Sequence, residues 1–148
     1  MEFELPKSVE DTKDPVILET RNYNLMMTEY EVADNNAQTG QNIILTLAVT
    51  GEGPEADGIS FKYYIPLPNP TDEGKTTRQN QPMVDWKVRN IADNVKILGG
   101  TMKGTKFVLP QTAMVKAMIK KEFNDDGIPY NTLDGRIMKA DKKGPSKS

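Results

Sequence analysis

Residues 41–68 constrain the fold of this chain more than any other segment. Two runs, residues 43–49 and 59–65, alternate apolar with more polar side chains and are rich in β-branched and aromatic residues. A period of two places successive side chains on opposite faces of a strand, so each run predicts a β-strand. The glycines and proline between the runs predict a hairpin with a longish loop. One face is predicted to be core, and the other, with Lys62 and Tyr64, could meet solvent or a ligand.

The segment before this hairpin, residues 16–34, predicts a long and bent first strand. The apolar phase of residues 23–27 is the opposite of the phase of residues 30–32. A phase change near Met27 and Thr28 is typical of a β-bulge, which bends a strand. A bent first strand allows a small sheet to curl into a barrel. The alternative interpretation is two separate short strands.

Residues 83–98 change to a helical period. Apolar residues recur every three or four positions, at Val84, Val88, Ile91, Val95 and Leu98. This stripe predicts an α-helix with one buried side, and Gly99 and Gly100 predict its end. Trp86 lies about 200° from the stripe at roughly 100° per residue. We expect it to cap the end of the barrel, the alternative being an exposed stacking surface.

The part after the helix is more ambiguous. Residues 101–111 read as a loop that holds a short apolar piece. Residues 112–123 fit both a helix, which Ala, Met and Lys favour, and a strand. The turn signal Asn-Asp-Asp-Gly at 124–127 and the β-like residues of 128–139 favour the strand, which is the interpretation we adopt. The predicted fold class is therefore all-β with one helix, in the order strand, strand, strand, helix, strand, strand.

Composition limits the chemistry open to this chain. It has 148 residues, 36% of them hydrophobic and 27% charged, which fits one domain with a modest core. It contains no Cys and no His, which excludes thiol nucleophiles and Cys-bound zinc and removes the commonest general base. We therefore expect neither an enzyme nor a cofactor. The net charge of −2 gives no overall attraction to nucleic acid, but local charge placement decides such contacts.

Charge patterning divides the chain into three parts. We expect an acidic arm over residues 1–14, one domain over 15–140 and a basic disordered tail over 141–148. No run approaches the roughly 18 apolar residues of a membrane span, and the acidic N-terminal segment is unlike a signal sequence. We expect no membrane partner and a location in the cytoplasm.

A proline-rich segment, residues 66–82, predicts a long exposed loop that is either functional or a plain linker. Its adjacent acids, Asp72 and Glu73, are expected to be solvated. Residues 99–106 superficially resemble a phosphate-binding loop, but Thr105 precedes Lys106, the reverse of the order that such a loop needs.

The remaining signal is a distribution of basic and aromatic residues. Single-stranded nucleic acid is held by bases stacked on aromatic rings and by a basic groove for the phosphates. The predicted nucleic-acid-binding residues are Lys62, Tyr64, Lys75, Arg78, Trp86, Lys106, Phe107, Lys116 and Lys120. The alternative is that these Lys and Tyr side chains are ordinary exposed positions.

The order of elements is that of the five-stranded OB barrel, whose helix lies between the third and fourth strands. The stretches YEVADNNAQTGQNIILTLAVT, VRNIADNVKILGG and AMVKAMIKKEFNDDGIPYNTLDGRIMKA also make the chain, over about residues 16–140, similar to single-stranded-DNA-binding proteins of bacteriophages. The resemblance implies an OB-fold protein that coats single-stranded DNA, or RNA, without sequence preference. It further implies phage DNA replication or recombination in the cytoplasm of the infected host, with phage or host replication proteins as partners.

Two features leave room for another interpretation. Many bacterial proteins with this function end in an acidic tail that recruits enzymes, whereas residues 142–148 are basic, so recruitment by that route is not expected. The acidic balance and the proline-rich loop also suit a protein-interaction or virion-assembly module on the same small barrel.

Overall fold

The computed structural model describes residues 1–12, 16–34 and 40–140. In chain order they form β1 (Arg21–Asp34), β2 (Gln41–Val49), β3 (Ser60–Pro66), α1 (Met83–Ile97), β4 (Thr101–Lys103), β5 (Lys106–Val108), β6 (Ala113–Phe123) and β7 (Pro129–Lys139). Short 3-10 turns lie at Val9–Asp11 and Pro70–Asp72. The predicted order of elements is confirmed, with β4 and β5 added. The predicted basic tail, residues 141–148, and the end of the predicted acidic arm lie outside the described residues.

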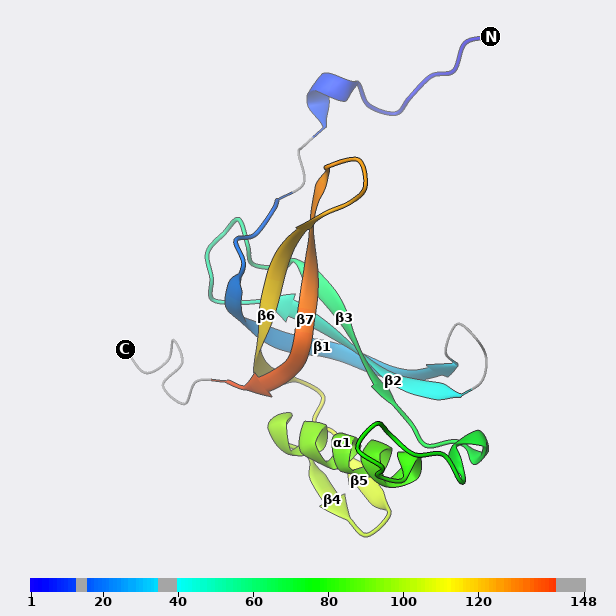
Figure 1. Cartoon of the computed structure of the whole chain (residues 1–148). Coiled ribbons are helices and arrows are strands. Elements are labelled where there is room, and N and C mark those ends of the chain that lie inside the picture. The colour runs from blue at the N-terminus through cyan, green and yellow to red at the C-terminus, as the bar shows by residue number, and fades with distance from the viewer. Residues whose placement is uncertain (13–15, 35–39, 141–148) are drawn as a thin grey trace.

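The main sheet is a five-stranded antiparallel sheet in the order β3-β2-β1-β6-β7. Its outer strands, β3 and β7, come into contact, so the sheet curls into a nearly closed barrel (Figure 1). This arrangement confirms the predicted fold class, a mostly β structure with one helix and a five-stranded OB-like barrel. The predicted strand over residues 112–123 is also confirmed, because β6 fills the place next to β1.

Strand β1 belongs to both halves of the barrel. It pairs with β6 from Arg21 to Met27 and with β2 from Leu25 to Asp34. The register against β2 shifts between Met27 and Glu29, which confirms the predicted bulge. The bulge changes the phase of the strand, so that Met27 is buried while the distal part of β1 leaves β6 and continues with β2 alone.

The core follows the predicted alternation. Every second residue of β2 from Ile43 to Val49 and of β6 from Val115 to Ile119 is buried, and the same holds for β1 from Tyr23 to Met27. The buried side chains of these three strands are Tyr23, Leu25, Met27, Ile43, Leu45, Leu47, Val49, Val115, Ala117 and Ile119. The sheet therefore encloses one apolar interior and turns the alternate side chains, some polar and some apolar, outward.

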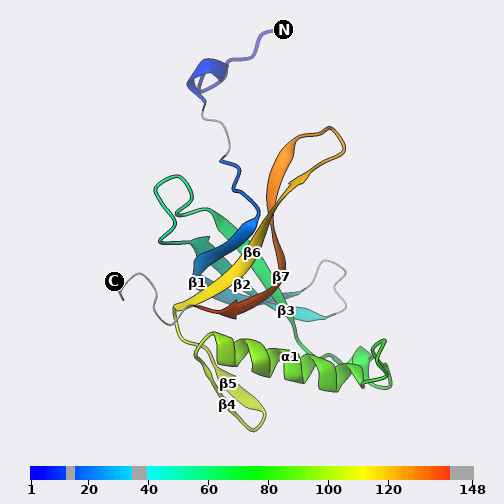
Figure 2. The ribbon, with the colours of Figure 1, turned by 60° about the vertical axis from the view of Figure 1, so that its left-hand side comes forward.

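Helix α1 lies at one end of the barrel (Figures 1 and 2). The hydroxyl of Tyr63 on β3 donates to Oδ1 of the buried Asn94 at 3.2 Å, and Arg136 on β7 donates to Oδ1 of Asn90 at 2.7 Å. The helix thus bonds to both strands that border the seam of the barrel. Within the described ranges, no helix combines the length and apolar character needed to cross a membrane.

The predicted apolar stripe of the helix is buried only in its second half. Ile91, Val95 and Leu98 belong to the core, but Val88 is 44% exposed. The side chain of Val88 lines an apolar pocket between α1 and the hairpin of β4 and β5 instead of entering the barrel. The prediction that Val88 is core was therefore wrong, because the stripe is longer than the barrel end that it covers.

Residues 101–111 are not the predicted loop, since they contain the two-stranded sheet of β4 and β5. The Gly99-Gly100 pair that ends α1 also brings this hairpin close. Gly99 has a φ of +79°, the left-handed conformation that commonly ends helices, and the N–H of Gly100 donates to the carbonyl of Val95 at 2.9 Å. A Cβ on Gly100 would lie 2.3 Å from the carbonyl oxygen of Val108.

We predict that Gly100→Ala destabilises the fold by about 1–3 kcal/mol, because the added methyl group overlaps a backbone atom that cannot move without shifting β5. Urea unfolding followed by circular dichroism measures the change. The neighbouring exposed substitution Thr101→Ala is the control and should stay within about 0.5 kcal/mol of wild type. Equal stability of the two variants would contradict the close approach.

Candidate nucleic-acid interface

The outer face of β3 presents Lys62 and Tyr64 two residues apart. Both side chains are exposed, Tyr64 by 55%. Tyr64 is in register with Ile44 on β2, which in turn is in register with Glu31 on β1. A half-exposed aromatic ring beside an aliphatic side chain offers a flat surface on which a base could stack.

The side chains in register with one another beside Tyr64, on the same face of the sheet, are polar: Lys62, Thr46 and Glu29. The Nζ of Lys62 donates to Oγ1 of Thr46 at 2.7 Å, and this hydroxyl lies 3.4 Å from Oε1 of Glu29. Glu29 and Glu31 lie across β2 from Lys62 and Tyr64. The face therefore carries one cation, Lys62, on β3 and two carboxylates on the distal part of β1.

Lys116 and Lys120 lie on the outer face of β6, as predicted, but at a distance from β3. Two strands separate β6 from β3 in the sheet, which at about 4.8 Å per spacing gives roughly 14 Å across. Between them runs a row of small and apolar side chains, Ser60, Ala48, Met26 and Met114. Lys120 also faces Asp134 on β7, with 3.6 Å between Nζ and Oδ2.

Lys75, Arg78 and Trp86 form a second group, at the N-terminal end of α1. The loop that carries the two cations is not the plain exposed linker that its prolines allow. Asn69 and Asp72 cap the 3-10 turn at Pro70–Asp72 reciprocally, and Thr76 bridges to Pro82. The main chain of Lys75 accepts from Met83 at 2.8 Å, and Arg78 is exposed, so the loop is fastened directly to the helix.

The expectation that Asp72 is a solvated acid was wrong. Its carboxylate is buried and lies 2.8 Å from Nζ of Lys87, a helix residue whose side chain is also largely covered. The hydrogen bond from Lys87, followed by the one from the N–H of Asn69, holds the pKa of Asp72 below its ordinary value of 3.8. This ion pair fixes the loop with Lys75 against α1.

The side chain of Trp86 is 41% exposed. This exposure fits the alternative prediction, an exposed stacking surface, better than the prediction that Trp86 caps the end of the barrel.

Lys106 and Phe107 form a third group, on β5. The hairpin of β4 and β5 lies on the side of α1 away from the barrel in both views (Figures 1 and 2). Phe107 is partly buried and is in register with Met102. The structure therefore places Lys62 and Tyr64 on one face of β3. Lys75 and Arg78 lie in the loop before α1 and Trp86 in its first turn, whereas Lys106 and Phe107 lie on β5.

A further exposed surface lies outside the nine residues predicted to bind nucleic acid. The ends of β6 and β7 form an arm that projects beyond the barrel (Figure 2) and carries Phe123 and Tyr130, both exposed. Nζ of Lys121 lies 5.8 Å from the centroid of the Phe123 ring. The phenol of Tyr130 donates to Glu122, whose carboxylate raises the pKa of Tyr130 above its ordinary value of 10.0.

The base of this arm is tied to the segment before β1. The main chain of Leu18 exchanges two hydrogen bonds with the side chain of Asn131, at 3.0 and 3.2 Å, and the N–H of Lys121 donates to Thr20 at 2.9 Å. The alternation of residues 119–123 could have indicated an exposed ring at Phe123. The sequence does not show, however, that the ends of β6 and β7 project beyond the core.

The surfaces described above carry exposed aromatic rings and cations. Among the described residues, no three or more carboxylates gather closely enough to hold a metal ion. Neither the models of protein families nor the curated proteins include a match to this chain.

We predict that Asp72→Asn destabilises the fold at neutral pH, because Lys87 then lacks its buried counter-charge. Since the pKa of Asp72 is lower in the folded than in the unfolded chain, the carboxylate stabilises the fold fully above 3.8 and less as the pH falls through its lowered folded value. The difference in unfolding free energy between wild type and variant should shrink over that acid range. Urea unfolding at a series of pH values measures it, with the exposed neighbour Glu73→Gln as control; a difference that stays constant in acid would contradict the ion pair.

Proposed function

We propose that this chain is a non-catalytic protein that binds single-stranded DNA without sequence preference, in phage DNA replication or recombination. The observation that carries the proposal is the exposed Tyr64, with Ile44 and Lys62 beside it, on the outer face of an OB-like sheet. Such folds commonly bind oligonucleotides on this part of the sheet and on the adjoining loops. RNA has the same stacking chemistry and is the related ligand.

In this mechanism the bases face the sheet and the phosphates meet the flanking cations. A base stacks on Tyr64 against Ile44, and Lys62 reaches a phosphate. Lys75 and Arg78 follow in the loop that continues from the end of β3, with Trp86 at the first turn of the helix. The arm of β6 and β7 supplies a further exposed ring, Phe123.

Replacing the ring tests this arrangement. We predict that Tyr64→Ala weakens the binding of an oligo-dT strand by about 5- to 150-fold, because one stacked base contributes about 1–3 kcal/mol. Oligo-dA and mixed sequences should lose a similar factor. Tyr30→Ala is the matched control, since Tyr30 is also exposed but is in register with Leu45 of the core side. Equal affinities of the two variants would remove Tyr64 from the site.

The charge of Lys62 gives a separate prediction. Each neutralised phosphate of a single strand contributes about −0.7 to the slope of log affinity against log salt. Lys62→Met should therefore make the slope shallower by about 0.7 while leaving much of the stacking energy in place. Fluorescence titrations that follow Trp86, the single tryptophan, at four or five salt concentrations measure this slope. An unchanged slope would mean that Lys62 meets no phosphate.

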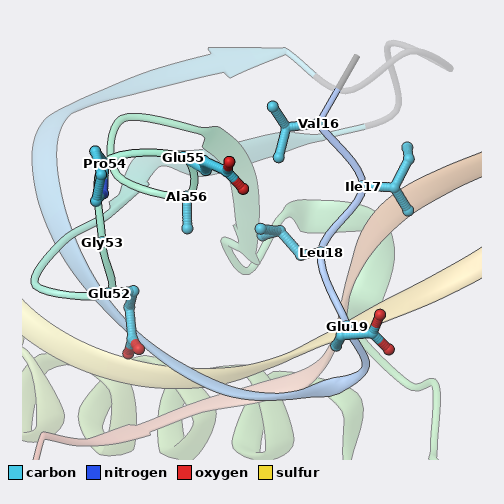
Figure 3. A pocket seen from close by; sticks show the side chains of 9 residues that line it. All are labelled: Val16, Ile17, Leu18, Glu19, Glu52, Gly53, Pro54, Glu55 and Ala56. Carbon is cyan, nitrogen blue, oxygen red and sulfur yellow. The ribbon is translucent and has the colours of Figure 1, made fainter. Parts of the chain in front are cut away.

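A second candidate function is a protein-interaction or virion-assembly module. A pocket of about 370 Å³ lies between residues 16–19 and the loop of residues 52–56, and Val16 and Leu18 point across it toward that loop (Figure 3). Its lining residues include Glu19, Glu52 and Glu55, of which Glu52 is already paired with Arg21, with 3.1 Å between Oε1 and Nη2. This acidic and apolar lining suits a basic and apolar segment of a protein better than it suits phosphates.

The same titrations distinguish the two functions. A saturable response to oligo-dT that weakens with salt supports nucleic-acid binding. A response that is absent at low salt in the wild-type chain would leave the protein-interaction module as the better account.

A further inference from the structure

Half of the methionines of this chain lie on the outer face of the barrel. Four of the eight have this place: Met26 on β1, Met114 and Met118 on β6, and Met138 on β7. Each is next in sequence to a buried core residue, so its own side chain points outward. Met114 is 41% exposed and Met138 is 37% exposed. Packing of the barrel core therefore does not account for these side chains.

Three of these methionines are neighbours across the strands. Met26 is directly in register with Met114, and side chains directly opposite each other in an antiparallel pair have Cβ atoms about 4.5–5.5 Å apart. Met138 is in register with Lys116, two residues after Met114. Met138 therefore lies diagonally from Met114, within reach of a long side chain. We call Met26, Met114 and Met138 together the methionine floor.

The methionine floor adjoins the face that carries Tyr64. Ser60 lies two residues before Lys62 on β3 and is in register with Ala48, which in turn is in register with Met26. All of these side chains are on the outer face, because directly opposite residues share a face. Two small side chains, Ser60 and Ala48, thus connect the row of Lys62 to the methionine floor.

The charges around the floor favour an anionic chain as its ligand. Two rows of side chains in register form and flank the floor: Ser60, Ala48, Met26 and Met114, and next to them Asn24, Lys116 and Met138. Neither row holds a carboxylate. Glu29 lies beyond the bulge of β1, and Asp134, opposite Met118, lies 3.6 Å from Nζ of Lys120 and so already has a partner cation. An apolar floor with Lys116 beside it suits bases carried on phosphates better than a basic protein segment.

We propose that the methionine floor is a second base-binding surface, on which the bases that follow the one stacked on Tyr64 pack against methionine side chains. The thioether of methionine is polarisable, adapts to the shape of its partner and makes favourable contacts with aromatic rings. Every base offers such a ring face, so the floor adds affinity without sequence preference.

This inference rests on the proposed function and deepens it. Lys62 and Lys116 are separated by roughly 14 Å across the sheet, which leaves two cations without a common surface. The floor supplies that surface, since it lies between β3 and Lys116. A single strand that passes Tyr64 can cross the sheet here and avoid Glu29 and Glu31.

Methyl NMR of the full chain labelled at its methionine methyl groups tests the proposal. The probe is an oligo-dT of about 16 nucleotides, the upper end of the site sizes of such folds. The resonances of Met26, Met114 and Met138 should shift, because stacked bases exert ring currents on methyl groups in contact with them. Met27, which is buried, and Met102, on β4, should not respond. A strand of the same length without bases should leave all five resonances in place.

A matched pair of variants tests the energetic contribution. Met26→Gln/Met114→Gln should weaken oligo-dT binding by about two- to tenfold, the factor that corresponds to a contact between a thioether and an aromatic ring. The slope of log affinity against log salt should not change, because no charge is removed. Met102→Gln is the control, since Met102 is 38% exposed but lies on the hairpin, and its affinity should equal that of the wild type. Circular dichroism verifies that each variant is folded.

Two outcomes would overturn this proposal and leave the proposed function intact. One is oligo-dT binding that depends on Tyr64 while the methyl resonances of the floor stay in place. The other is wild-type affinity of folded Met26→Gln/Met114→Gln. Shifts of the floor resonances with protein concentration in the absence of nucleic acid would assign the floor to a contact between copies of the chain, and would overturn the proposal as well. Absence of oligo-dT binding by the wild type at low salt would reject both proposals together.

Discussion

The bulge in β1 is the constraint on which the rest of this structure depends. One strand must pair with β6 through its first half and with β2 through its second, and an unbroken strand could not serve both without turning the wrong side chains inward. The extra residue at Thr28 bends the strand and inverts its phase, so that Met27 is buried while Glu29 reaches the outer face. The place of Glu29 beside Thr46, and the distal part of β1 that pairs with β2 but not with β6, follow from this one insertion.

Most of the barrel could be predicted because its information is local. A period of two with β-branched residues identified β2 and β3, and the phase change in residues 23–32 located the bulge. The segment of residues 112–123 was decided by its turn signal at 124–127 and not by its helix-favouring composition, since packing against β1 outweighs propensity. The helical period of the apolar stripe was predicted correctly. The stripe is longer than the end of the barrel that the helix covers, and the periodicity does not show where that end lies. Val88 is exposed for that reason.

The relations between elements could not be read from the sequence in the same way. The alternation within β3 placed Lys62 and Tyr64 on one face, but their neighbours Glu29 and Glu31 depend on the register after the bulge. Asp72 and Lys87 are fifteen residues apart with no periodic link, so a buried ion pair between loop and helix leaves no pattern. The hairpin of β4 and β5 was not predicted either, because each of its strands has only three residues, too few to show a periodic pattern. Lys106 and Phe107 were consequently grouped with residues that lie on other surfaces.

The carboxylates beside Tyr64 restrict how a single strand could lie on this sheet. Glu29 and Glu31 occupy the β1 side of the face, where a phosphate would meet like charge. The β3 side leads instead into the loop of Lys75 and Arg78, which the pair of Asp72 and Lys87 holds against the helix. A backbone following β3 toward that loop keeps its phosphates on the cationic side and turns its bases toward Tyr64 and Ile44. The bulge that shapes the barrel thus also fixes which edge of the face is acidic, and with it the path that a polyanion could take.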